Sequence, residues 1–292
     1  VLYRSLANLT SPLGISGSKY DPKVIFDPTN NRFIMIFLSG FTWETSQIIV
    51  GFSQTNDPTG DWNMYALPGN PLDNETWSDY PVVGISGKDL FIGINTFTNG
   101  STNNSGFTQT CLWQVGLKEG YVGFELVTNY FSDILPQNKP IFNIAPISAA
   151  DASDAENMYL LSNRNTDIQN DTIFLLEVTG RATDSTTQLV VTTIQSDQPY
   201  VLPVPAEQAA NQWFDTNDSR VLGGYIHNGT IHFVQSCTDI NTGTSAIYYG
   251  LIDEPSGNPT VTTRIYSEPN VYYGFPNISW SGLSENDEQS II

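Results

Sequence analysis

The stretch from residue 20 to residue 67, YDPKVIFDPTNNRFIMIFLSGFTWETSQIIVGFSQTNDPTGDWNMYAL, decides the fold. It holds four runs rich in β-branched and aromatic residues, and each run is closed by Asn, Asp, Gly or Pro. Such runs separated by turn residues predict four strands in an antiparallel meander. One sheet of this kind leaves two faces and two edges open, so it needs neighbours.

The same pattern recurs along the chain, starting near Asp21, Asp79, Asn143, Asp218 and Asn277. Subtraction gives spacings of 58, 64, 75 and 59 residues. A period of this size predicts an all-β propeller of four-stranded antiparallel blades, in a single domain over residues 1–292. About five blades are expected, at 19–68, 78–131, 140–197, 215–267 and, incomplete, 273–292.

Residues 1–18 are predicted to form one further strand, which either closes the ring or belongs to a blade that precedes this chain. Pairing the two termini would remove an exposed edge, which favours closure. Donation of a terminal strand between subunits is a third alternative and would build a polymer. The number of blades in the intact protein stays open at this point.

The composition is strongly acidic, with 30 Asp and Glu against 11 Lys and Arg and a net charge of −19. Such a surface repels nucleic acid and anionic lipid, so neither is expected as a partner. No apolar stretch approaches the ~18 residues of a membrane span. The chain begins with Val1 rather than Met, which indicates a processed or trimmed end and is compatible with secretion.

Eight Asn-x-Ser/Thr sequons favour a secreted or cell-surface glycoprotein. They are Asn8, Asn74, Asn99, Asn103, Asn170, Asn217, Asn228 and Asn277. The two cysteines, Cys111 and Cys237, fall in blades that are not adjacent. They are therefore expected to be two small buried thiols rather than a disulfide.

Three segments carry a family resemblance: Tyr20-Asp21-Pro22-Lys23-Val24-Ile25-Phe26-Asp27, residues 53–62 and Ser78-Asp79-Tyr80-Pro81. They resemble the propeller domain of large secreted bacterial proteins of the sialidase-like superfamily, most of them uncharacterised. The resemblance implies a structural hairpin at 53–62 and a chain that is a fragment of a longer protein. The start Asp21-Pro22-Lys23-Val24 also resembles, more weakly, the strand that carries the general base in five-bladed glycosidases acting on arabinans and xylans.

A propeller gathers the starts of its inner strands around one channel, so Asp21, Asp79 and Asp218 are expected near one mouth. Paired carboxylates suit glycoside hydrolysis, where one protonates the leaving oxygen and the other acts as base or nucleophile. Asp21 and Asp79 are the catalytic candidates. The alternative is that an Asp in such a turn accepts backbone N–H bonds and only caps it.

Other ligand sites are expected in the loops. Trp43 and Trp77 are candidates for stacking on sugar rings, although propellers also pack their blades with such residues. Asp151, Asp154 and Glu156 supply the hard oxygen ligands that calcium prefers, and a solvated acidic loop is the alternative. A sialidase needs three convergent arginines, and the six arginines of this chain are poorly placed for that role.

The sequence thus favours a non-catalytic extracellular propeller that binds a carbohydrate or protein partner, or assembles with itself. The alternative is a glycoside hydrolase that uses Asp21 and Asp79. Two carboxylates facing a ligand favour the enzyme, and carboxylates satisfied by the backbone favour the scaffold.

Overall fold

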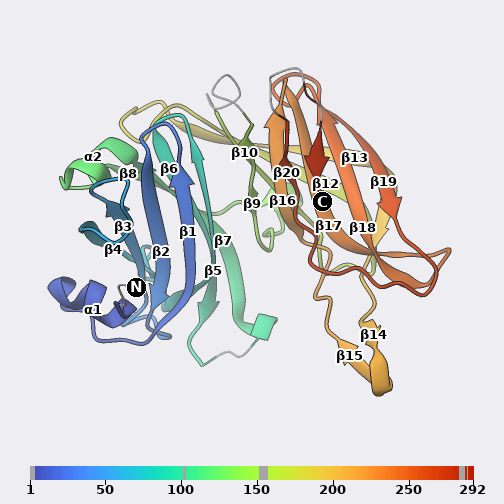
Figure 1. Cartoon of the computed structure of the whole chain (residues 1–292), viewed down its shortest axis with the longest axis horizontal. Helices are drawn as coiled ribbons and strands as arrows, with labels where there is room; N and C mark the ends of the chain where they lie inside the picture. The colour runs from blue at the N-terminus through green and yellow to red at the C-terminus, as the bar shows by residue number, and fades with distance from the viewer. Residues whose placement is uncertain (1–3, 101–102, 151–156, 283–286, 288) are drawn as a thin grey trace. The chain divides into compact units, whose positions relative to one another are not determined.

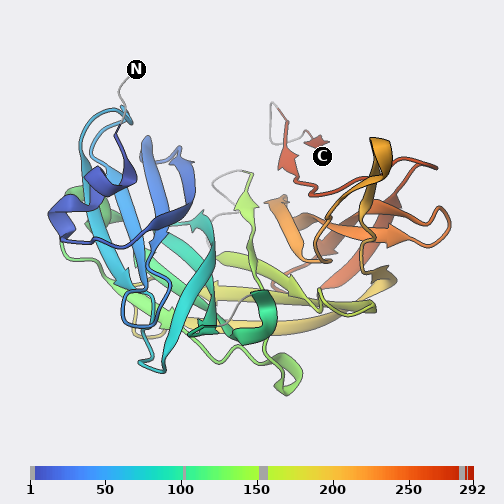
Figure 2. The same cartoon turned by 90° about the horizontal axis from the view of Figure 1, so that it is seen from below.

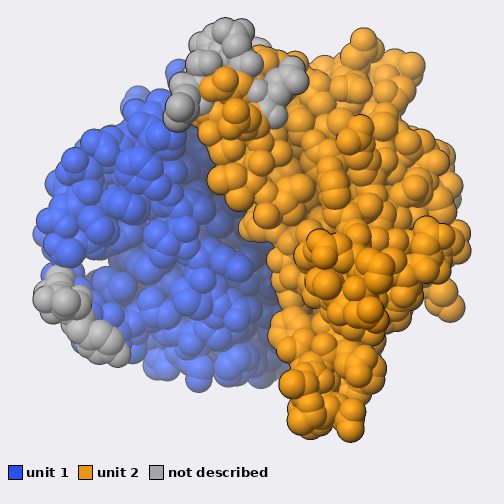
Figure 3. Space-filling model, turned by 45° about the vertical axis from the view of Figure 1, so that its right-hand side comes forward, with its two compact units in different colours: residues 1–135, 180–187 blue, residues 136–179, 188–292 orange. Residues whose placement is uncertain are grey.

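The computed structural model describes residues 4–100, 103–150, 157–282, 287 and 289–292, with the side chains of 103 and 104 left aside. The chain divides into two compact units (Figure 3). Unit 1 comprises residues 1–135 and 180–187, and unit 2 comprises residues 136–179 and 188–292. None of the helices in the described ranges combines the length and hydropathy of a membrane span.

Unit 1 contains two four-stranded antiparallel meanders, which can be followed from blue through teal to green in Figures 1 and 2. The first consists of β1 (Lys19–Asp27), β2 (Arg32–Ser39), β3 (Gln47–Ser53) and β4 (Trp62–Pro68). The second consists of β5 (Thr76–Ser86), β6 (Asp89–Thr98), β7 (Phe107–Gly116) and β8 (Thr128–Phe131), with helix α2 (Leu117–Val122) before its last strand.

The two meanders share one apolar core. It joins Ile36 and Val50 of the first sheet to Ile92, Cys111 and Val115 of the second, all essentially buried. Burying these side chains stabilises the pair of sheets by about 25 cal/mol per Å² of apolar surface. The alternation along each strand puts these residues on one face, which explains why the blades pack through that face.

Unit 2 contains two more antiparallel four-strand units. The third blade consists of β9 (Ala145–Pro146), β11 (Met158–Asn163), β12 (Gln169–Thr179) and β13 (Gln188–Val201). The fourth consists of β16 (Val221–His227), β17 (Thr230–Asp239), β18 (Thr244–Asp253) and β19 (Thr260–Tyr266). One parallel residue pair, Ser196 with Val261, links β13 to β19, and β10 (Ser148–Ala149) lies parallel to β16.

Two short ribbons complete unit 2. β14 (Ala206–Gln208) and β15 (Gln212–Phe214) form a ribbon that projects from the rest of the unit (Figure 1). β20 (Ser279–Trp280) pairs with β21 (Ser290–Ile291) in place of the incomplete fifth blade. The two four-stranded sheets of unit 1, and the four-strand units joined in one nine-stranded sheet of unit 2, confirm the predicted all-β, β-propeller fold class. The single-domain prediction stays a prediction, since each unit is described by itself.

Both cysteines are buried free thiols, as predicted. Cys111 lies in β7 and Cys237 in β17. Burial raises the pKa of the Cys111 thiol to about 11 and that of Cys237 to about 12. Neither thiol is therefore a ready nucleophile.

The predicted strand in residues 1–18 is wrong over its described part. Helix α1 (Leu6–Thr10) and the 3₁₀ helix η1 (Ser11–Leu13) occupy it instead, and Ser5 caps α1 by accepting the Asn8 N–H (3.2 Å). The physical reason is the spacing of Leu6, Leu9 and Leu13, which lie at helical intervals and pack on Met35, Phe37 and Ile49 of the first blade. In the described part of this segment, α1 and η1 cover a sheet face, and donation of a terminal strand stays a prediction.

Candidate active site

A β-bulge interrupts β1 near its start and β5 after its first four residues. The register of β1 with β2 breaks between Tyr20 and Lys23, and that of β5 with β6 breaks between Asp79 and Val82. Asp21 (φ 50°) and Tyr80 (φ 55°) take the left-handed conformation there, each directly before a proline. A bulge redirects side chains at a strand end, and left-handed non-glycine residues cost about 1–3 kcal/mol each.

The two candidate carboxylates differ by one position relative to their bulges. Tyr20 and Asp79 are the last paired residues before their bulges, while Asp21 and Tyr80 are the bulged residues themselves. The one-residue offset does not separate the acids. The charge of Asp21 raises the pKa of the Asp79 carboxyl, so the two interact within unit 1.

Asp79 is half-buried, and burial is the main cause that raises the pKa of its carboxyl. A hydrogen bond from the Tyr80 backbone opposes this effect, and the charge of Asp21 adds to it. Asp21 is exposed and accepts no hydrogen bond from the part of the chain that the structure describes. Asp21 therefore does not cap its turn, in contrast to the scaffold alternative.

A phenol belongs to the same cluster. The Tyr20 hydroxyl donates to the carbonyl oxygens of Gly40 (2.8 Å) and Ser78 (3.4 Å), which ties β1 to the loop after β2 and to β5. Burial and then the charges of Asp79 and Asp21 raise the pKa of Tyr20, so it stays a neutral donor. Tyr20 thereby fixes the strand end that carries Asp21.

An exposed aromatic ring lies directly beside this cluster. Phe41 stacks on Tyr20 with a centroid distance of 4.7 Å and an interplanar angle of 20°, and 52% of its surface is exposed. The turn before it requires Gly40, whose φ is +81° and where a Cβ would lie 2.2 Å from the Thr45 carbonyl oxygen. Sequence reasoning missed Phe41; the signal was an aromatic residue right after a glycine in the loop between β2 and β3.

The predicted stacking residues Trp43 and Trp77 are both half-buried. The Trp43 N–H donates to Asn99 Oδ1 (2.8 Å), and the Trp77 ring packs against Phe97 at 5.7 Å. Their stacking role stays a prediction, and Phe41 is the more exposed ring.

The third predicted acid, Asp218, lies in unit 2 and is fully engaged. Arg220 donates to both its carboxylate oxygens from Nε and Nη2, each at 2.7 Å, and Asn165 Nδ2 donates at 2.9 Å. This buried ion pair and its amide donor engage both carboxylate oxygens within the fold. Asp218 is therefore a structural residue, and the third blade offers buried Asn143 in place of a carboxylate.

The proposed calcium ligands Asp151, Asp154 and Glu156 lie outside the described residues. Within the described ranges, no group of three or more His, Cys, Asp or Glu is arranged to hold a metal ion. In the loop of residues 215–218, Asp215 Oδ1 accepts the Asn217 N–H at 2.8 Å, which is a local turn.

Glycosylation of the eight sequons stays a prediction. Asn8, Asn74, Asn99, Asn217, Asn228 and Asn277 are exposed, and Asn170 is half-buried. The side chain of Asn103 lies outside the described residues.

Comparisons with known proteins give a fold likeness only. No protein-family model and no curated protein sequence matches this chain. One similar solved structure is from the GH130 family of mannoside phosphorylases, which contains glycoside hydrolases that target beta-1,2 mannosidic linkages in Candida mannan (7% identity, TM-score 0.46, 89% of this chain and 72% of that one).

A second similar structure is a glycosyl hydrolase from Bacteroides ovatus (7% identity, TM-score 0.43, 87% of this chain and 71% of that one). A third is an endo-arabinase from Bacteroides thetaiotaomicron VPI-5482 (13% identity, TM-score 0.39, 86% and 81%). At these identities and TM-scores they assign no residue of this chain a role. An arabinan-cleaving enzyme is thus among the similar structures, while the resemblance to the sialidase-like superfamily stays a prediction.

Proposed function

We propose that this chain is a glycoside hydrolase with Asp79 as its general acid and Asp21 as the partner carboxylate. The observation that carries the proposal is the contrast between two interacting carboxyl groups at the bulges of β1 and β5 in unit 1. Asp79 is half-buried with a raised pKa, whereas Asp21 is exposed and has no internal hydrogen-bond donor in the described chain. Two carboxyl groups in unlike environments suit an acid and its ionised partner.

The chemistry follows from these environments. Asp79 would donate its proton to the glycosidic oxygen as the bond to the anomeric carbon breaks. Asp21 would either attack that carbon or take a proton from the attacking water. Retention or inversion at the anomeric carbon, measured by NMR on the first product, distinguishes these two routes.

The test uses purified wild-type protein, Asp21→Asn, Asp79→Asn and, as a matched control, Asp61→Asn on an exposed residue of the same unit. Release of reducing ends is measured on a panel of neutral polysaccharides that includes mannan, arabinan and xylan. Loss of a general acid or its partner typically costs about 10²–10⁴-fold in rate. The proposal is overturned if both active-site variants, folded by circular dichroism, keep wild-type rates, or if wild-type protein cleaves nothing in the panel.

A second candidate function is non-catalytic glycan binding. It is favoured by the exposed Phe41 ring on its Tyr20 support, which suits the apolar face of a sugar, and by the engagement of Asp218 in an ion pair. Affinity electrophoresis on the same panel separates the two functions. Retarded migration without any release of reducing ends supports the binding function.

Either function fits a secreted or cell-surface location, which we include in the proposal on the strength of the exposed sequons. Fractionation of the native producer, with detection by antibody, tests it.

A further inference from the structure

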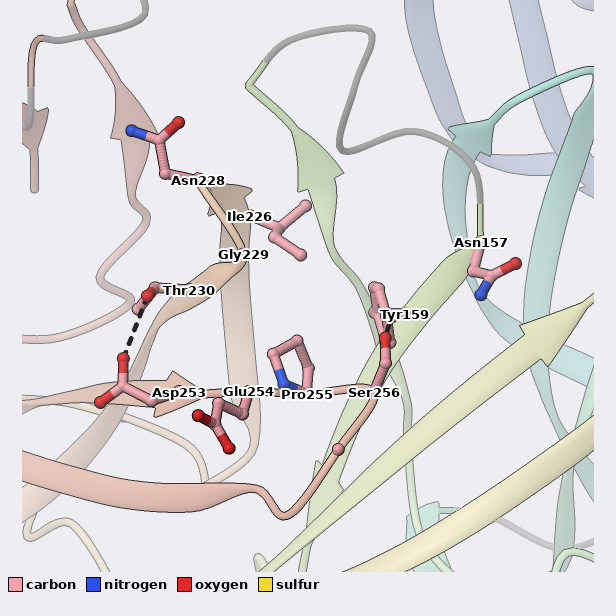
Figure 4. A pocket seen from close by; sticks show the side chains of 11 residues that line it. Asn157, Tyr159, Ile226, Asn228, Gly229, Thr230, Asp253, Glu254, Pro255 and Ser256 are labelled. Atoms are coloured by element: carbon pink, nitrogen blue, oxygen red, sulfur yellow. Dashed lines mark hydrogen bonds between the residues drawn. The ribbon is translucent and has the colours of Figure 1, made fainter.

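Unit 2 contains a pocket of about 650 Å³ that the function proposed above does not use. It lies between the β16–β17 turn, the β18–β19 turn and the start of β11, and Figure 4 shows the side chains around it. A hollow of this size is within the range of small-molecule sites. The lining residues are Asn157, Tyr159, Ile226, Asn228, Gly229, Thr230, Asp253, Glu254, Pro255, Ser256 and Gly257.

The walls of the pocket are held in place by hydrogen bonds across its elements. Thr230 Oγ1 donates to Asp253 Oδ1 at 3.0 Å, which fixes one carboxylate (Figure 4). The Tyr159 hydroxyl donates to Glu177 Oε1 at 3.1 Å and is also hydrogen-bonded to the Ser256 hydroxyl. The wall from the third blade is therefore tied directly to a turn of the fourth, so the site is built before a ligand arrives.

The chemistry of the lining selects a ligand class. Asp253 and Glu254 are exposed carboxylates, and none of the described lining residues is basic, so an anionic ligand is disfavoured. Hydroxyl and amide groups alternate with the apolar surface of Ile226 and Pro255. Carboxylates accept strong hydrogen bonds from hydroxyl groups, and apolar patches suit C–H faces.

We infer that this pocket binds a neutral sugar, with the carboxylates of Asp253 and Glu254 accepting hydrogen bonds from its hydroxyls. The site lies in unit 2, carries no catalytic step and does not depend on the Asp21–Asp79 pair of unit 1. It would hold a glycan to the protein whether or not the chain cleaves one.

Replacing Glu254 by glycine tests the site without adding backbone strain. It has a left-handed φ of 52°, a conformation that glycine adopts without cost. Glu254→Gly removes the carboxylate and the backbone strain together. We expect this variant to unfold at the same or a higher temperature than wild-type protein while its sugar affinity falls at least about 10-fold.

The test is isothermal titration of full-length protein with a panel of neutral mono- and disaccharides, for wild type, Glu254→Gly and Asp253→Asn. Glu207→Gln, an exposed acid on the β14–β15 ribbon, is the control and should bind like wild type. A weakened affinity in both pocket variants supports the site.

Three results overturn the inference: no sugar binds, binding is unchanged in both pocket variants, or the control loses affinity equally. A separate titration with CaCl₂ tests whether the two carboxylates bind a cation instead of a sugar. Calcium binding that the pocket variants abolish, with no sugar binding, would reassign the site to a cation. Loss of this site leaves the release of reducing ends by unit 1 as an independent test of the proposed function.

Discussion

At the residue scale, Phe41 is the side chain whose role can be tested most directly. Phe41→Ala removes the exposed ring that stacks on Tyr20, and we expect binding of a polysaccharide to weaken about 5-fold, since an aromatic stack is worth ~1 kcal/mol. Phe41→Trp should retain affinity. Affinity electrophoresis measures both, and Phe124→Ala, which removes a ring that is 64% exposed elsewhere in unit 1, is the control. Equal losses in Phe41→Ala and Phe124→Ala would contradict a specific role.

The raised pKa of Asp79 predicts a pH-dependent stability difference. A carboxyl whose pKa is higher in the folded than in the unfolded protein adds stability at low pH, and this stability is lost as the pH rises through the folded pKa. Asp79→Asn lacks the buried charge, so it should have a Tm about 1–3 °C above wild type near neutral pH. The difference should vanish at about pH 3.

Thermal unfolding followed by circular dichroism across this pH range checks the prediction, and Asp61→Asn should follow wild type throughout. A lower Tm for Asp79→Asn at neutral pH would mean that the carboxylate is a stabilising group. In that case Asp79 would be a turn residue, and its place in the catalytic proposal would be lost. A gain in stability together with a loss of activity is the behaviour expected of a catalytic residue.

The sequence predicted where the carboxylates lie along the chain but not what surrounds them. Asp21 and Asp79 were assigned to strand starts because turn residues and β-branched runs mark those starts. Pro22 and Pro81 mark the two bulges, and Asp21 directly precedes its proline whereas Asp79 lies two residues before its own, so the one-position offset was also open to sequence reasoning. Asp218 was predicted to lie at a strand start like Asp21 and Asp79. In the structure its carboxylate accepts a hydrogen bond from Asn165, which is 53 residues away in sequence. Partners that arrive through tertiary packing leave no local signal.

At the element scale, α1 tests how the first blade is covered. Leu6 and Leu9 are partly buried against Met35, Phe37 and Ile49. Replacing both leucines by alanine should cost about 2 kcal/mol, because each loses part of its apolar burial. The Tm should fall by about 4–8 °C. Asn8→Ala, on the exposed side of the same helix, should leave the Tm within about 1 °C. No change in the double variant would show that α1 does not contribute to stability.

The blades were predictable because their evidence is local and repeated, whereas α1 was not. Each strand of the first meander carries its own β-branched run and its own turn, and the copies support one another. Helix α1 has only five residues, so the helical spacing of Leu6, Leu9 and Leu13 shows only when α1 and η1 are taken together, and Val1 and Tyr3 before it are residue types that favour β structure. Its helical state depends on the Ser5 cap and on the sheet face beneath its leucines, which only the folded chain provides.

At the scale of the whole molecule, the net charge of −19 predicts which polysaccharides the protein accepts. A polyanion such as polygalacturonate is repelled at low ionic strength, and salt screens the repulsion because the Debye length falls to about 10 Å at 0.1 M. Binding of polygalacturonate should therefore strengthen as NaCl rises from about 20 to about 300 mM. Binding of neutral mannan or arabinan should change less than about two-fold. Affinity electrophoresis at each salt concentration tests this. Tightest binding of the polyanion at low salt would show that a local basic surface outweighs the overall charge, and the ligand would then be an acidic glycan.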